Sequence, residues 1–79
     1  MAKGLHDERY RRLMERLVAR RKELGLTQQA VADMVGMHQQ NVSRFETGER
    51  RLDVVEFLDV AHALGLTATT LLQDVRPLS

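Results

Sequence analysis

The sequence predicts an all-α fold made of five helices. Apolar residues recur at intervals of three and four, which is the spacing that places side chains on one face of a helix. No segment shows the alternation of apolar and polar residues that is typical of a half-buried strand. Each helical segment but the last is followed by a glycine, the residue preferred just beyond a helix C-terminus: Gly25, Gly36, Gly48 and Gly65. The 79 residues provide one domain with a single modest core.

The first two helices are expected over about residues 7–24 and 28–35. Thr27 is expected to cap the second, because a hydroxyl before the first turn can accept a hydrogen bond from a free backbone N–H. The second helix buries Val31 and Val35. The apolar stripe of the first helix consists of Tyr10, Leu13, Met14, Leu17, Val18 and Leu24.

The third, fourth and fifth helices are expected over about residues 38–47, 54–64 and 68–73. Asp53 and Glu56 have the spacing of a capping box at the start of the fourth helix, and Thr67 is expected to cap the fifth. The third helix turns Val42 and Phe45 inward, together with Met37 just before it. The inner face of the fourth helix is predicted to contain Val54, Phe57, Leu58, Ala61 and Leu64. We expect the domain to span residues 7–73, between a flexible N-terminal arm (1–6) and a C-terminal tail (74–79).

The second and third helices are joined by only three residues, Gly36, Met37 and His38. So short a connection forces the two helices to cross steeply and approach closely, and the small side chain of Ala32 permits that approach. This arrangement predicts a helix-turn-helix, whose second helix can enter the major groove of DNA.

Two segments, "GLTQQAVADMVGMHQQNVSRFETGER" and "LDVVEFLDVAHALGLTATTLL", resemble the XRE/Cro-type, lambda-repressor-like DNA-binding domains. The resemblance covers about residues 10–73 and implies a compact five-helix lambda-repressor-like fold. His38 departs from the family's usual Ser or Thr cap of the third helix, and Met34 stands where a polar residue is usual. The residues in family register are Gln28, Ala32, Gly36, Val42, Phe45, Glu46 and Gly48.

The start of the third helix carries a row of hydrogen-bonding side chains that the core cannot use. The resemblance implies that Gln39, Gln40 and Arg44 read base edges, and Asn41 lies where it could touch a base or a phosphate. Glutamine and asparagine can form paired hydrogen bonds with adenine, and arginine does so with guanine.

Further residues are expected to contact the DNA backbone. Gln28 opens the second helix, where free N–H groups favour an anion, and it binds the sugar-phosphate backbone in the family. Ser43 can contribute its hydroxyl, while Arg50 and Arg51 follow the third helix and either flank the groove or form a merely solvated loop. His38 is either a phosphate contact or an exposed capping residue.

Two charged residues continue apolar stripes and therefore point toward the core. Arg21 lies one turn beyond Leu17, and Glu46 lies one turn beyond Val42. Because a buried charge is tolerated only when it is paired, we expect Arg21 and Glu46 to form a structural ion pair, as the matching positions do in the family.

Composition argues against several classes of protein. The sequence contains no cysteine, and its three histidines are expected on different elements, so we expect neither a metal site nor a cofactor nor catalysis. No apolar run approaches the roughly 18 residues that cross a membrane, which predicts a cytoplasmic protein. Residues 1–51 carry a charge balance of +4 and residues 52–79 one of −3, so one end of the molecule can meet a polyanion.

Together these features predict a small stand-alone repressor or controller that binds a pseudo-palindromic duplex as a homodimer. The resemblance implies dimerisation in the region of the fourth and fifth helices, where the family often dimerises, with the expected contacts Leu66, Leu71, Leu72 and Val75. The alternative is a protein-interaction module, such as an antitoxin-type partner, in which DNA binding is secondary. An exposed apolar patch would favour that alternative, with Met34, Leu71, Leu72 and Val75 as its members.

Overall fold

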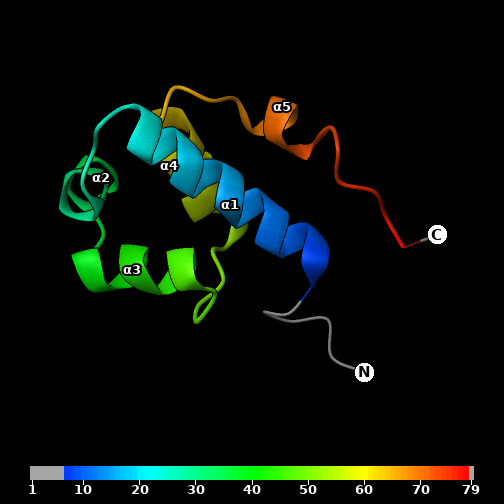
Figure 1. Ribbon diagram of the computed structural model, residues 1–79, viewed down its shortest axis with the longest axis horizontal. Coiled ribbons are helices and arrows are strands. Elements are labelled where there is room, and N and C mark those ends of the chain that lie inside the picture. The colour runs from blue at the N-terminus through cyan, green and yellow to red at the C-terminus, as the bar shows by residue number, and fades with distance from the viewer. Residues whose placement is uncertain (1–6, 79) are drawn as a thin grey trace.

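The computed structural model describes residues 7–78, which fold into five α-helices with no strand among them. The helices are α1 (Glu8–Glu23), α2 (Gln28–Val35), α3 (Gln39–Thr47), α4 (Val54–Ala63) and α5 (Ala68–Leu72). α2 and α3 lie toward one end of the molecule and α5 lies toward the other, with α1 and α4 between them (Figure 1). The predicted all-α, five-helix class is confirmed, whereas the predicted arm at residues 1–6 lies outside the described residues.

Four of the five helices begin at a side chain that accepts a hydrogen bond from the first turn. The Asp53 carboxylate accepts from the Glu56 N–H at 2.7 Å, and the Glu56 carboxylate accepts from the Asp53 N–H at 3.0 Å, which completes the predicted capping box. α3 differs, because His38 occupies its N-cap position without a side-chain hydrogen bond to the helix. The other capping residues are Asp7 on α1, Thr27 on α2 and Thr67 on α5.

The helix-turn-helix depends on a glycine at the end of each of its helices. Gly36 and Gly48 adopt φ values of 73° and 86°, in the left-handed region that other residues rarely occupy. Gly36 therefore reverses the chain between α2 and α3, and Gly48 turns it from α3 into the loop that precedes α4.

The core forms where α1, α2, α3 and α4 meet. Phe45 of α3 is its largest fully buried side chain, and Ala32 of α2 is completely buried, as the close approach of α2 and α3 requires. The buried apolar residues are Leu13, Met14, Leu17, Val31, Ala32, Val42, Phe45, Val60, Ala61, Leu64 and Leu71.

The predicted inner face of α4 is partly wrong. Val54 and Leu58 are 76% and 49% exposed, whereas Val60, which the prediction omitted, is 1% exposed. α4 carries apolar residues around most of its circumference, so its pattern admits more than one buried stripe. Packing selects the stripe through Phe57, Val60, Ala61 and Leu64.

The C-terminal part of the chain packs more closely against the rest of the domain than predicted. Leu71 is a core residue, so its assignment to a dimer interface is wrong: a side chain that the monomer already buries cannot cover a partner. Val75 packs against the same core, and the guanidinium of Arg9 donates a hydrogen bond to the Arg76 carbonyl at 2.7 Å. The first residues of the predicted tail therefore pack on the domain.

None of the helices within residues 7–78 has both the length and the apolar character needed to cross a membrane.

Candidate nucleic-acid interface

The outer face of α3 presents polar side chains that serve no purpose in packing. Gln40 and Arg44 are exposed one helical turn apart, while Val42 and Phe45 are buried on the opposite face. Within residues 7–78, Arg44 forms no ion pair and Gln40 forms no side-chain hydrogen bond. Their polar ends are therefore available to a ligand without the loss of an internal contact.

Asn41 and Ser43 lie half-buried at the edges of this row, and His38 is exposed at its N-terminal end. Because the His38 side chain does not cap α3, its imidazole can turn to solvent or to an anion. These residues flank the exposed pair and extend the polar surface along α3.

Gln39 and Gln28 are brought together from adjacent helices. The Gln39 side-chain amide donates to the Gln28 side-chain oxygen at 2.7 Å, and the Gln28 amide donates to Glu46 Oε1 at 2.9 Å. Each glutamine thus has a fixed orientation before any ligand arrives, which lowers the conformational cost of a later contact.

The structure also brings Arg21 and Glu46 together. Arg21 Nε donates to Glu46 Oε2 at 2.7 Å and Arg21 Nη2 donates to Glu46 Oε1 at 3.0 Å, a paired geometry that arginine forms well with carboxylates. The two side chains are 12% and 9% exposed, and Arg21 Nη1 also donates to the Leu26 carbonyl at 2.8 Å. A continuous chain of hydrogen bonds therefore runs from α1 through Glu46 and Gln28 to Gln39 at the start of α3.

The loop between α3 and α4 carries Arg50 and Arg51, and contacts hold it at both ends. Arg50 Nη2 donates to Glu56 Oε2 at 2.8 Å. This hydrogen bond lowers the pKa of the Glu56 carboxyl group below its ordinary value and raises the pKa of the Arg50 guanidinium. Arg50 is therefore bound to a residue of the α4 capping box. Its side chain is not merely solvated, which was one of the two alternatives for this loop.

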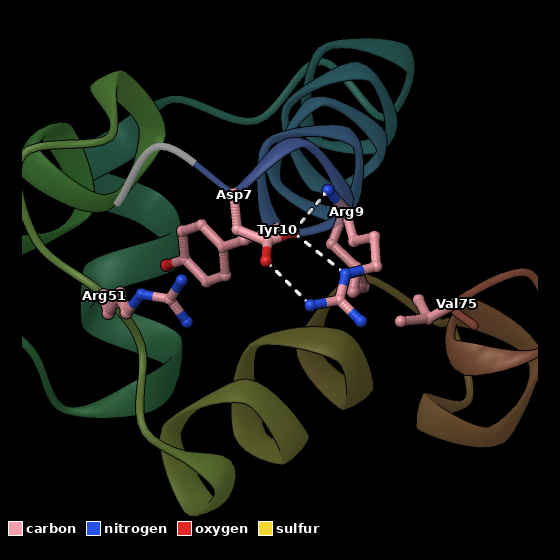
Figure 2. A pocket seen from close by; sticks show the side chains of 6 residues that line it. Asp7, Arg9, Tyr10, Arg51 and Val75 are labelled. Atoms are coloured by element: carbon pink, nitrogen blue, oxygen red, sulfur yellow. Dashed lines mark hydrogen bonds and ion pairs between the residues drawn. The ribbon is translucent and has the colours of Figure 1, made fainter. Parts of the chain in front are cut away.

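Tyr10 of α1 holds the other part of this loop. Its hydroxyl accepts a hydrogen bond from the Leu52 N–H at 2.9 Å and donates to the Arg50 carbonyl at 3.5 Å. The Arg51 guanidinium lies 4.4 Å from the centre of the Tyr10 ring, within the range of a cation–π contact (Figure 2). The apolar stripe of the first helix predicts a core position for Tyr10, and this polar contact with the loop was not expected from the sequence.

A shallow pocket opens beside Tyr10, but its polar groups are already engaged. Arg9 Nε and Nη2 donate to the Asp7 carboxylate at 3.0 and 2.7 Å, as Figure 2 shows. Nor does the described part of the chain gather three His, Asp or Glu side chains in a metal-binding arrangement.

Two helices joined by a tight turn, the second with an exposed row of amide and guanidinium groups, define a helix-turn-helix DNA-binding domain. Comparison with known proteins gives the same class: a helix-turn-helix family model matches residues 17–71. A solved structure of an XRE-family like protein from Pseudomonas syringae pv. tomato str. DC3000 is also similar. It is 40% identical over 85% of this chain and 82% of that chain, with a TM-score of 0.79. Among curated proteins, no sequence matches the chain.

The chain belongs to the XRE-type helix-turn-helix family, and it is a DNA-binding regulator of that class. The family expected from the sequence is confirmed.

Proposed function

We propose that the protein is a sequence-specific transcriptional repressor or controller that inserts α3 into the major groove of duplex DNA and acts as a homodimer. The observation that carries the proposal is the exposed pair Gln40 and Arg44, whose polar ends are unengaged on the face of α3 opposite the core. Asn41 and Gln39 extend the base-reading row in this proposal. A glutamine can form two hydrogen bonds with adenine, and an arginine with guanine.

The DNA backbone would be held on both sides of this row. Gln28 lies at the N-terminus of α2, where backbone N–H groups are free to meet a phosphate. Ser43 and His38 border the row, and Arg50 and Arg51 follow α3 in the loop held by Tyr10. Since Arg50 is already paired with Glu56, a phosphate would compete with that carboxylate for its guanidinium.

The test begins with selection of a preferred duplex from a randomised pool and continues with titrations of Gln40→Ala. Loss of one base contact should weaken binding to the selected duplex by about 1–3 kcal/mol per half-site, with little change on a scrambled duplex. The matched control is Gln73→Ala, which removes an exposed glutamine at the C-terminus of α5. All titrations use one salt concentration, because phosphate contacts make affinity depend on salt.

Equal losses on both duplexes, or no loss on either, would contradict base reading by Gln40. Absence of any duplex preference in the wild-type protein would contradict the proposed function itself. The alternative is a protein-interaction module with an exposed apolar patch. Leu71 is buried and cannot belong to that patch, whereas Met34 and Leu72 are exposed.

A further inference from the structure

An apolar groove lies where α1 meets the loop before α4 and the end of α5. It encloses about 210 Å³, and its apolar side chains come from all three helices and the loop. Neither the core nor the proposed DNA contact uses this surface. A concave apolar surface with a few polar groups at its edge is the usual form of a site for a small molecule. The apolar lining includes Tyr10, Leu13, Leu52, Phe57 and Leu72.

Arg51 supplies a positive charge at this groove. Its guanidinium lies 4.4 Å from the centre of the Tyr10 ring, and both residues belong to the lining. An arginine placed over an aromatic ring can still present its N–H groups to a carboxylate in its own plane. Asp53 also lines the groove, but its carboxylate accepts the Glu56 N–H at 2.7 Å in the cap of α4. The groove therefore combines apolar walls with a guanidinium that suits an anionic group.

The neighbouring hollow on Tyr10 is less suited to such a ligand. Tyr10 and Arg51 line this hollow too, together with Arg9 and Asp7 (Figure 2). The Asp7 carboxylate pairs with the Arg9 guanidinium at 2.7 Å and would repel a second anion there. An apolar anion is therefore better accommodated in the groove, with its charge at Arg51.

We propose that the groove binds a small apolar carboxylate, and that this ligand releases the protein from DNA. The hydrocarbon part would pack against Phe57 and Leu72, and the carboxylate would pair with Arg51. The volume lies below the roughly 300–1,000 Å³ of sites for drug-sized ligands, so the ligand is about one ring in size.

The release rests on the proposed function, in which Arg51 contacts a DNA phosphate. A bound carboxylate and a phosphate would compete for the same guanidinium. Ligand and DNA would therefore weaken each other's binding, and by linkage the factor is the same in both directions.

The first experiment measures ligand binding by the free protein, with cyclohexanecarboxylate as the probe. Tyr10 is the only tyrosine of the sequence, which contains no tryptophan, so its fluorescence reports on the groove directly. Cyclohexanecarboxylate should change this fluorescence in a saturable way. Its uncharged amide should bind on the order of tenfold more weakly, because it loses a hydrogen bond between charged groups. Acetate, which lacks the ring, should also bind at least about tenfold more weakly.

Four variants separate the groove from general surface effects. Arg51→Gln should reduce binding of the carboxylate to the level of the amide, and Leu72→Gln should weaken both ligands alike. Arg12→Gln and Leu24→Gln change the same residue types at exposed positions of α1 or its C-cap, outside the groove, and should leave both affinities unchanged. Thermal unfolding checks that each variant folds.

The second experiment adds the same probe to a complex with a selected duplex. Saturating cyclohexanecarboxylate should weaken specific DNA binding by roughly 5-fold or more, the lower end of the usual coupling between two ligands. The Arg51→Gln variant should bind the duplex equally well with and without the probe.

Equal binding of the carboxylate and the amide to the wild-type protein would overturn the anionic class of ligand. Unchanged Tyr10 fluorescence with all three probes would overturn the site. Ligand binding without an effect on specific DNA binding would overturn the release alone. Absence of specific binding to any duplex would overturn the proposed function and the release, whereas measurements on the free protein decide the binding site independently.

Discussion

At the scale of single residues, Glu46 shows how one nearly buried charge can hold several helices together. Its carboxylate accepts two hydrogen bonds from Arg21 and one from Gln28, and thereby joins α1, α2 and α3. A buried carboxylate is costly unless hydrogen bonds replace the water that it loses, and here they do. The same group that stabilises the fold also orients Gln28, the partner of Gln39 at the proposed interface.

Glu46→Ala should lower the free energy of unfolding by about 3–5 kcal/mol, because it leaves the nearly buried Arg21 guanidinium without its carboxylate. Urea denaturation followed by far-UV circular dichroism measures the change. Glu15→Ala is the matched control: Glu15 pairs with Arg11 on the surface and is 60% exposed, so its loss should cost less than about 1 kcal/mol. Similar midpoints for the two variants would show that the Arg21–Glu46 pair contributes little.

At the scale of elements, the α3–α4 loop is held in place by side chains of two other helices. The Tyr10 hydroxyl holds the loop backbone near Leu52, and Glu56 holds Arg50 while it also caps α4. The loop is therefore constrained by α1 on one side and by α4 on the other. Such constraint places arginines for phosphate contact at a lower entropic cost than a free loop would.

Arg51→Ala should weaken binding to all duplexes alike and reduce the salt slope by about one unit, the amount expected for one lost phosphate contact. Titrations at several salt concentrations measure the slope. Arg12→Ala removes an exposed arginine from α1 and should leave the slope unchanged. A changed sequence preference with an intact slope would assign Arg51 to base reading instead.

Acid stability tests the link between the loop and α4. Because Arg50 lowers the pKa of Glu56 in the folded protein, the ion pair contributes stability above the unfolded-state pKa, and this stability is lost as the pH falls through the lower, folded-state value. Glu56→Gln should therefore cost about 1 kcal/mol or less at neutral pH and flatten the loss of stability below about pH 4.5. Urea titrations from about pH 2 to about pH 7, a range that brackets the ordinary glutamate pKa, measure the free energy of unfolding as a function of pH.

The control for the acid titration is Glu49→Gln, an exposed loop carboxylate that forms no ion pair within residues 7–78. Its profile should follow that of the wild type. If Glu56→Gln also followed the wild-type profile, the Arg50–Glu56 pair would not contribute to stability in solution.

At the scale of the whole molecule, the core extends from the helix-turn-helix to α5, which contributes the buried side chain of Leu71. Leu71→Ala should lower the free energy of unfolding by about 2–5 kcal/mol, the usual cost of removing a buried leucine side chain and leaving a cavity. Leu72 is the adjacent residue and is exposed, so Leu72→Ala should change stability by no more than about 0.5 kcal/mol. Equal effects in thermal or urea unfolding would show that α5 does not pack as described.

The sequence alone was sufficient to predict the five helices, the helix-turn-helix and most of the capping residues. These features depend on residues close together in the chain: Thr27 caps a helix that begins one residue later, and Asp53 and Glu56 are three residues apart. Arg21 and Glu46 could be matched because each charge continues an apolar stripe and a buried charge requires a partner.

Only the tertiary structure decided which side of α4 is buried, where Leu71 lies, and what holds the loop beside α3. α4 has apolar residues on most of its sides, so the choice of Val60 over Val54 depends on the helices that pack against it. The Tyr10 hydroxyl contacts a backbone N–H that is 42 residues away in the sequence, and no local sequence pattern predicts such a contact. Such contacts arise when distant helices pack and must satisfy their remaining polar groups, and for this reason the sequence determines the elements but not the contacts between them.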